Sequence, residues 1–333
     1  MYLVTTHPHR LPSDHQIIMV DGTVPQWQPR PYDLHWDHHR SGGAPIQVAE
    51  MPLPQATTLL QERGGPLPPC FTTTQVDADA CVAAAWVQLP RSVLQQFPIV
   101  QQLQAIAWDC DHLRVPPELD PWGEFALKVV ASLKVQEKTV REALELPPDR
   151  KQWQDQDRER FSSAAFEAGT QWLIAAALGQ RSWPGEVGEA EAYWQQLQRD
   201  CDQLRQDHRV QLLPSGQGLF AVCDLRGIDR YIDPRGFYQV LAEIATPEQL
   251  RPETLTWRDR PQGGWSYTLG SIPLHPRQGA LDFTQGTFDR LTQAEQAKSG
   301  QPDPWGGRST VGGSPWNAAS VLTPGEILAV LGD

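Results

Sequence analysis

Carboxylates and imidazoles gather in three short stretches of this 333-residue chain. The stretches are WDHH at 36–39, VDAD at 76–79 and WDCDH at 108–112. Burying like charges side by side is costly unless a cation or a proton compensates them. Carboxylates mixed with imidazoles are expected to bind Mn²⁺, with Fe²⁺, Zn²⁺ or Mg²⁺ as alternatives, rather than Ca²⁺. The candidate metal ligands are Asp37, His38, Asp77, Asp79, Asp109 and Asp111.

So many ligands indicate two metal ions that share a carboxylate. A metal pair generates hydroxide and stabilises in-line displacement at phosphorus, which predicts chemistry on phosphate esters. His39 and His112 are then candidate catalytic residues for proton transfer or charge stabilisation. Each stretch also has a simpler interpretation. WDHH and WDCDH could be polar turns, and Asp77 could cap a helix that carries Asp79 in its first turn.

The elements that would position these side chains are strands that end in Asp or His. Four such strands are predicted within 15–22, 32–39, 70–79 and 103–112, and residues 80–89 are predicted to form a helix. Ligands of an open α/β sheet lie beyond the carboxyl ends of its strands, so the four ends are expected to converge. Asp21 occupies an equivalent strand end, although Asp-Gly is also a common turn.

The rest of the chain divides into a helical part and a second mixed part. Helices are predicted within 124–146, 161–179 and 189–210, and strands follow at 218–227, 253–260 and 264–272. Further helices are predicted at 235–245 and, after a Thr-Pro start signal, at 323–332. We therefore predict an α/β protein: a mainly parallel N-terminal sheet domain, a helical connector and a smaller C-terminal α+β domain. The expected boundaries are 1–117 with packing helices to about 180, then 181–209, then 210–333.

A glycine-rich stretch, WGGRSTVGGSPWN at 305–317, lies before the last helix. Its backbone N–H groups could form an anion cradle, or the stretch could be an ordinary flexible loop. If it is a cradle, it would hold a substrate phosphate together with the arginine that follows WDHH. The candidate substrate-binding residues are Arg40, Arg308, Gly312, Gly313, Ser314 and Asn317.

These motifs resemble those of the DHH phosphoesterases, a superfamily of two-metal exonucleases, oligoribonucleases, cyclic-dinucleotide phosphodiesterases and inorganic pyrophosphatases. The resemblance rests on the DHH string at 37–39, on TTTQVDADACVAAAWVQL at 72–89 and on GGSPWNAAS at 312–320. It implies that Asp77, Asp79 and the DHH residues hold two Mn²⁺ ions and that Asp109 or Asp111 completes the site. In the family the Asp-x-Asp pair precedes DHH. Here DHH comes about forty residues earlier, so the resemblance implies a rearranged order of elements.

The composition narrows the class of partner. The net charge of −12 disfavours a broad surface for long nucleic acids, because phosphate affinity requires clustered Lys and Arg. Five dispersed cysteines and the lack of an 18-residue apolar run predict a cytoplasmic protein with reduced thiols and no membrane segment. The chain could form a homodimer.

Two hypotheses of function follow. The first is a metal-dependent phosphoesterase, with two Mn²⁺ ions as the expected metal, that hydrolyses a phosphorylated small molecule or a short oligonucleotide. The alternative is a non-catalytic metal- or nucleotide-binding protein on a two-lobed scaffold of the same type.

Overall fold

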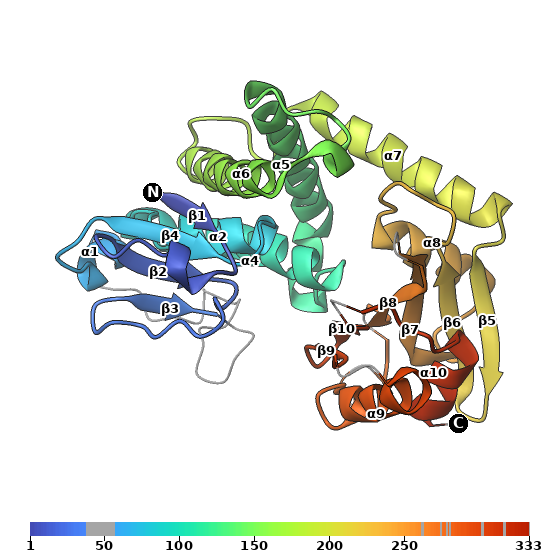
Figure 1. Cartoon of the computed structure of the whole chain (residues 1–333). Coiled ribbons are helices and arrows are strands. Elements are labelled where there is room, and N and C mark those ends of the chain that lie inside the picture. Colours follow the sequence, from blue (N-terminus) through green and yellow to red (C-terminus); the bar gives the residue numbers. More distant parts are fainter. Residues whose placement is uncertain are drawn as a thin grey trace. The chain divides into compact units, whose positions relative to one another are not determined.

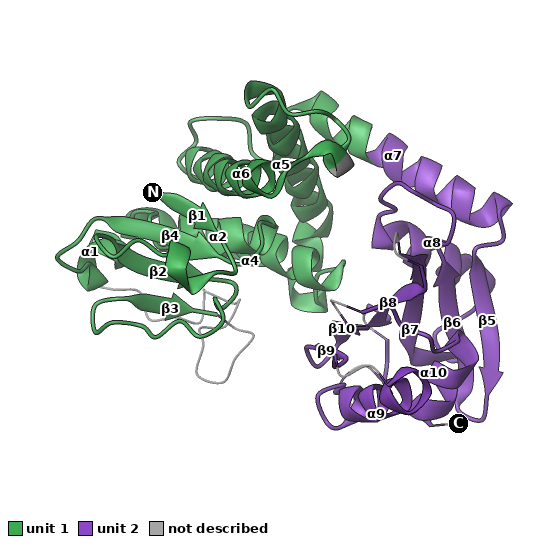
Figure 2. Cartoon of the chain, viewed as in Figure 1, with its two compact units in different colours: residues 1–193 green, residues 194–333 purple. Residues whose placement is uncertain are grey.

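The structure is a computed structural model that describes residues 1–37, 57–260, 263–273, 275–277, 279, 281–300, 303–315 and 318–332. The chain divides into two compact units, Met1–Tyr193 and Trp194–Asp333 (Figure 2). The first unit contains a parallel sheet and the second a mixed sheet, and both sheets are covered by helices. The predicted α/β class is therefore confirmed.

The sheet of the first unit has four parallel strands in the order β1-β4-β2-β3. Its strands are β1 Tyr2–Val4, β2 Gln16–Val20, β3 Leu34–Trp36 and β4 Pro69–Thr73. Three of the predicted strands are confirmed. Residues 2–4, which the sequence analysis did not assign to a strand, provide the fourth by pairing with β4.

The strand predicted within 103–112 is wrong, because these residues form the last part of helix α4, Phe97–His112. Pro98 stands in the first turn, and the buried residues Val100, Leu103, Ile106 and Ala107 follow a helical spacing. The predicted carboxyl strand end at Asp109 and Asp111 is therefore the C-terminal turn of a helix.

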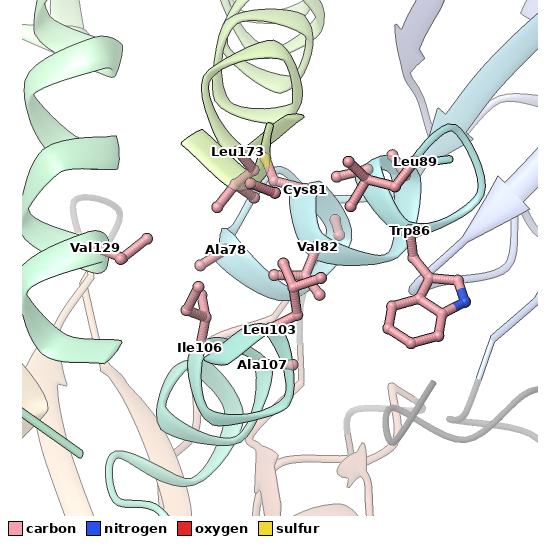
Figure 3. Close-up of a cluster of buried hydrophobic side chains, with 14 of the residues drawn as sticks. Ala78, Cys81, Val82, Trp86, Leu89, Leu103, Ile106, Ala107, Val129 and Leu173 are labelled. Carbon is pink, nitrogen blue, oxygen red and sulfur yellow. The ribbon is translucent and has the colours of Figure 1, made fainter. Parts of the chain in front are cut away.

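Helices pack on one face of the first sheet (Figure 1). They are α1 Leu59–Arg63, α2 Ala78–Trp86, α3 Arg91–Leu94, α4, α5 Gly123–Ala143 and α6 Asp155–Ala177. Figure 3 shows their core, in which Cys81 and Val82 of α2 face Leu103 and Ile106 of α4 and Leu173 of α6. On the other face, Ile17 and Met19 pack against Leu11, Val24 and Trp27 from loops. Alternate residues of β2 thus serve two cores, which makes the strand buried throughout.

Helix α7, Val187–Gln206, contains the point at which the two units divide. Its N-terminal part belongs to the first unit, where Glu189 accepts a hydrogen bond of 2.7 Å from the buried Ser132 hydroxyl of α5. Its C-terminal part belongs to the second unit, where Cys201 and Leu204 pack against Phe237 of helix α8, Pro234–Ile244. The helix predicted at 189–210 is confirmed and ends four residues before the predicted boundary.

The sheet of the second unit has six strands in the order β5-β6-β7-β8-β10-β9. Its strands are β5 Val210–Ser215, β6 Gly218–Asp224, β7 Leu250–Asp259, β8 Trp265–Ser271, β9 Gly306–Gly307 and β10 Val311–Gly313. Strands β6 and β7 are parallel and are joined through α8, whereas the other neighbouring pairs are antiparallel.

Helices cover both faces of this second sheet (Figure 1). Ala221 and Cys223 of β6 face α7 and α8, whereas Phe220 and Val222 face α9 Thr287–Ser299 and α10 Pro324–Leu331. Thr323 caps α10 and forms a capping box with Glu326, which confirms the predicted Thr-Pro helix start. No helix in the described part of the chain is long and apolar enough to cross a membrane.

Candidate metal site

The carboxyl ends of β2, β3 and β4 lie level with one another at one edge of the parallel sheet. Val20 pairs with Trp36, and Met19 pairs with Thr72, so Val20 is also level with Thr73. Asp21 and Asp37 are the residues directly after β2 and β3, and both side chains are buried. The structure therefore places one aspartate at the end of each of two neighbouring strands.

Asp77 and Asp79 reach this edge through the turn after β4. Asp77 is the N-cap of α2, where its Oδ1 accepts a hydrogen bond of 2.9 Å from the Ala80 backbone. Asp79 lies in the first turn and is buried. The capping interpretation of the sequence is confirmed, but capping uses only Oδ1. Among the described residues, none donates a hydrogen bond to Oδ2 of Asp77.

Three carboxyl groups lie close enough to Asp77 to influence its charge. The pKa of Asp77 is raised well above its usual value by burial, and next by the negative charges of Asp21, Asp79 and Asp111. These acids come from β2, from α2 and from the end of α4. The structure thus places Asp79 and Asp111, two of the predicted ligands, near Asp77, although Asp111 lies on a helix and not on the predicted strand. Asp21, whose role the sequence left open, belongs to the same group.

Helix α4 contributes its last turn to this group. Burial and the charges of Asp77, Asp111 and Asp79 raise the pKa of the Cys110 thiol well above its usual value. Asp109 is buried on the neighbouring side of the same turn. His112 packs its ring 4.3 Å from the ring centre of Trp108. The C-terminal end of α4 is therefore a second source of acidic side chains beside the start of α2.

Threonine hydroxyls fix the turns that carry the aspartates. The buried Thr73 hydroxyl lies 3.0 Å from the carbonyl oxygens of both Asp21 and Gln75, so it links the turn after β2 to the turn after β4. Asp21 adopts a left-handed backbone conformation, and the next residue is Gly22 at φ 144°. A Cβ at Gly22 would lie 2.3 Å from the Thr74 hydroxyl, so only glycine fits in this turn.

Thr23 plays a similar part for Asp37. Its hydroxyl donates to Oδ2 of Asp37 and lies 2.9 Å from Nε2 of His35. A hydroxyl has one proton, so its oxygen accepts from Nε2 of His35 when the proton goes to Asp37. Asp37 therefore enters the site already oriented by a side chain that the motif search did not find.

Three predicted site residues, His38, His39 and Arg40, lie outside the described residues. Asp37 directly precedes them and is placed at the end of β3. Strand β2 lies between β3 and β4, so Asp37 and the start of the β4 turn are separated by two strand spacings, or about 10 Å. In the order of the sheet, the end of β2 with Asp21 lies between Asp37 and the turn after β4.

The chemistry of the donor set fits a hard divalent cation. Carboxylate oxygens are the ligands that Mn²⁺ and Mg²⁺ prefer, and the mutual repulsion recorded at Asp77 is what a cation relieves. Within the described ranges alone, no group of three or more His, Cys, Asp and Glu side chains is arranged to hold a metal ion.

The glycine-rich stretch of the second unit forms a β-hairpin. Strands β9 and β10 pair, and the backbone N–H of Arg308 donates to the carbonyl of Val311 at 2.7 Å. A Cβ at Gly312 would lie 2.3 Å from the Phe288 ring, so this glycine is required by packing. The Ser314 hydroxyl is buried and accepts a hydrogen bond of 3.0 Å from the Tyr267 backbone.

The hairpin is held against α9 by a buried carboxylate. Glu295 is fully buried and accepts hydrogen bonds from Trp305 Nε1, from the Ser320 hydroxyl at 2.7 Å and from the Val321 backbone at 2.7 Å. The first residue of the glycine-rich stretch and the chain shortly after the stretch are thereby attached to one helix. Arg308 is exposed and Gly313 is partly exposed, and Asn317 lies outside the described residues.

Comparison with known proteins gives two similarities. No family model matches the chain. Over 152 residues, which are 42% of this chain, it is 34% identical to cellulose synthase operon protein C of Xanthomonas axonopodis pv. citri, and the match covers 9% of that protein. The chain thus spans only a small part of the length of this curated relative. Among solved structures it is similar to the pGpG-specific phosphodiesterase PggH of Vibrio cholerae, at a TM-score of 0.37 and 11% identity, over 95% of this chain and 97% of that one. Neither similarity assigns the chain to a family.

Proposed function

We propose that this chain is a metal-dependent phosphoesterase that acts on a phosphorylated small molecule or a short oligonucleotide. The observation that carries the proposal is the crowding of Asp77 by Asp21, Asp79 and Asp111 at the carboxyl edge of a parallel sheet. Such crowding is unfavourable unless the site is meant to bind positive charge. The carboxyl edge is also where open α/β sheets bind their ligands.

In this proposal, the cations are bound by aspartates from three parts of the first unit. Asp77 and Asp79 bind cations from the start of α2, Asp21 and Asp37 from the strand ends, and Asp111 from the end of α4. Divalent cations, when bound there, would compensate the negative charge of a phosphate ester and activate a water molecule for attack on phosphorus. Mn²⁺ is the proposed cation.

Of the two histidines proposed for proton transfer, His112 lies in the part of the chain that the structure describes. It lies at the end of α4, one residue after Asp111, and its ring is fixed against Trp108. In this proposal it stabilises or protonates the leaving oxygen. His39, from the DHH string, is the alternative candidate for the same role.

The charge of the chain supports a small substrate. With a net charge of −12, the protein repels long polyanions, whereas a short ester needs only a local patch of positive charge from cations and nearby arginines.

The direct test is turnover of a panel of phosphoesters. The purified full chain would be assayed with Mn²⁺ and with a chelator on an aryl phosphodiester, an aryl phosphomonoester and short linear dinucleotides. We expect Mn²⁺-dependent release of product that the chelator stops and that Asp79→Asn abolishes. Chelator-resistant turnover, or full activity of Asp79→Asn, would contradict the proposal, as would the absence of any turnover by protein that binds Mn²⁺.

One observation favours the alternative of a non-catalytic binding protein. The hairpin glycines and the Ser314 hydroxyl are engaged in packing and in a backbone hydrogen bond, so this stretch supports the second unit structurally. Stoichiometric Mn²⁺ binding together with no turnover across the panel is the result that this alternative predicts.

A further inference from the structure

Among the described residues of the second sheet, Arg258 of β7 differs from three other arginines in having no acidic partner. Arg226 pairs with Asp224 at 2.7 Å, Arg230 pairs with Asp200, and Arg251 pairs with Glu253 at 3.2 Å. Within the described part of the chain, the partly buried Arg258 side chain makes neither a hydrogen bond nor an ion pair. Burial lowers the pKa of its guanidinium, which shows that desolvation is not offset by a counter-charge.

The unpaired charge is unexpected in this molecule. The chain has 40 Asp and Glu against 28 Lys and Arg, so carboxylates are abundant. The adjacent Asp259 lies on the opposite face of β7, where it accepts a hydrogen bond from the Gly227 backbone. Removing part of the hydration of a cation without supplying an anion costs free energy, and such a cost is commonly retained where a ligand supplies the anion.

The strand register places hydroxyl groups beside Arg258. Ser266 of β8 is directly opposite Arg258, and Thr256 is two residues earlier on the same face of β7. Directly opposed side chains have Cβ atoms about 5 Å apart, so both hydroxyls are within reach of an anion bound at the guanidinium. On the same face, Cys223 and Ala221 of the neighbouring strand β6 pair with Thr256 and Thr254 and belong to the core under α8.

An exposed aromatic ring lies close to this polar end of the face. Tyr231 is 71% exposed and lies in the loop after β6, which is attached to the end of β7 by the hydrogen bond of 2.8 Å from the Leu225 backbone to the Trp257 carbonyl. A planar base can stack on an exposed tyrosine while its phosphate is bound a few ångströms away.

We propose that Arg258, with Ser266 and Thr256, binds the phosphate group of a nucleotide whose base stacks on Tyr231. The choice of a phosphate ester as ligand rests on the proposed function, whereas the anion site itself rests on the second unit alone. Arg258 presents a planar, bidentate donor set suited to phosphate oxygens.

The test is binding of adenosine 5′-monophosphate, adenosine and inorganic phosphate to the full chain in the presence of a chelator. We expect Arg258→Gln to weaken binding of the monophosphate and of inorganic phosphate by about tenfold or more, as for loss of a charge-assisted hydrogen bond. Tyr231→Ala should weaken binding of the monophosphate by roughly fivefold and leave the affinity for inorganic phosphate unchanged. Arg205→Gln, which removes an exposed arginine paired with Glu243, is the matched control and should leave all three affinities unchanged.

The outcomes separate this inference from the proposed function. Unchanged affinity of Arg258→Gln, or no saturable binding of the monophosphate by the native chain, overturns the inference. Asp77→Asn should bind the monophosphate normally, since no metal is present. If Arg258→Gln proves unfolded by circular dichroism, Ser266→Ala replaces it and should weaken phosphate binding by about threefold.

Discussion

Each unit carries an aspartate at the carboxyl end of a strand, followed by a helix, and the two aspartates have opposite surroundings. Asp77 follows β4 and is surrounded by other acids, so burial and their charges raise its pKa. Asp224 ends β6, where burial also raises its pKa, but hydrogen bonds from Arg226 lower it by more. The difference teaches that a strand-end aspartate becomes a metal-ligand candidate through its neighbours rather than through its position.

The comparison of the two units also involves the arginine side chains of the second unit. In the second unit, arginines neutralise the strand-end acids, and Arg226 also lies 3.4 Å over the Trp257 ring. Only Arg258 lacks an acidic partner among the arginines compared above. In the described residues, acids thus gather around Asp77 in the first unit, whereas Arg226 neutralises Asp224 in the second.

The largest expected effect comes from exchanging aspartate for asparagine at the two matched positions. Asp77→Asn keeps a good N-cap but loses a charged ligand, so Mn²⁺ affinity should fall by at least roughly 100-fold, above the loss typical of outer-sphere partners. Asp224→Asn should leave Mn²⁺ affinity unchanged. Competition titration against a metallochromic indicator measures both. Equal losses in the two variants would remove the distinction between the two strand ends.

The pH dependence of stability should have opposite sign for the two aspartates in metal-free protein. A raised pKa means that folded Asp77 keeps a proton that the unfolded chain releases above the usual value of 3.8. The free energy of unfolding should therefore fall as the pH rises from 3.8 through the raised pKa, and Asp77→Asn should remove that fall.

For Asp224 the lowered pKa works the other way. Its contribution is present above 3.8 and is lost as the pH falls through the lowered pKa. Urea unfolding of the native chain, Asp77→Asn and Asp224→Asn between roughly pH 3 and pH 8 checks both signs. If Asp77→Asn had the same pH dependence of stability as the native chain, this would contradict the crowding of Asp77 by acids at the carboxyl edge of the parallel sheet.

A smaller effect is expected from the hydroxyl that links the two aspartate turns. Thr73→Val removes the hydrogen bonds to the Asp21 and Gln75 carbonyls while keeping shape, and Mn²⁺ affinity should fall about tenfold. Thr72→Val, one residue earlier on β4, is the matched control and should leave affinity unchanged. Thr73→Ser should restore binding. A loss of stability without any change in affinity would assign Thr73 a purely structural role.

The smallest effect on stability is expected at the end of β6, where Arg226 neutralises Asp224. Arg226→Gln removes a bidentate ion pair that is partly exposed, so stability should fall by about 1 kcal/mol. The same variant should raise the pKa of Asp224 without creating a metal site, because none of the described acids crowds Asp224 as Asp21 and Asp79 crowd Asp77. New Mn²⁺ binding in the second unit would show that the arginine alone separates the two edges.

Much of the fold could be predicted from local patterns, and the errors have physical causes. The runs around Ile18, Phe71 and Val222 are apolar and bounded by turn residues, so the strands were found. The segment 103–112 was mistaken for a strand because a short apolar run that ends in acids fits either element, and only its helical spacing distinguishes the two. The strand at 2–4 is too short to have a periodicity of its own.

The site was predicted only in part, because spacing reveals motifs and not their contacts. Asp77, Asp79 and Asp111 could be singled out because each lies two residues from another acid in the sequence, and the structure places Asp79 and Asp111 near Asp77. Asp21 joins them through the parallel register of β2 with β4, which no local pattern shows. Thr23 and Thr73 act through single hydroxyl hydrogen bonds, and a threonine beside a strand end has no distinctive sequence signal.

The central claim is that the acidic edge of the first unit binds divalent cations. The most direct measurement is the Mn²⁺ content of the full chain after loading and exhaustive dialysis, by atomic spectroscopy, with Asp77→Asn measured in parallel. The account predicts about two equivalents per native chain and none in the variant. A native chain that retains no Mn²⁺, or a variant that retains as much as the native chain, would contradict it.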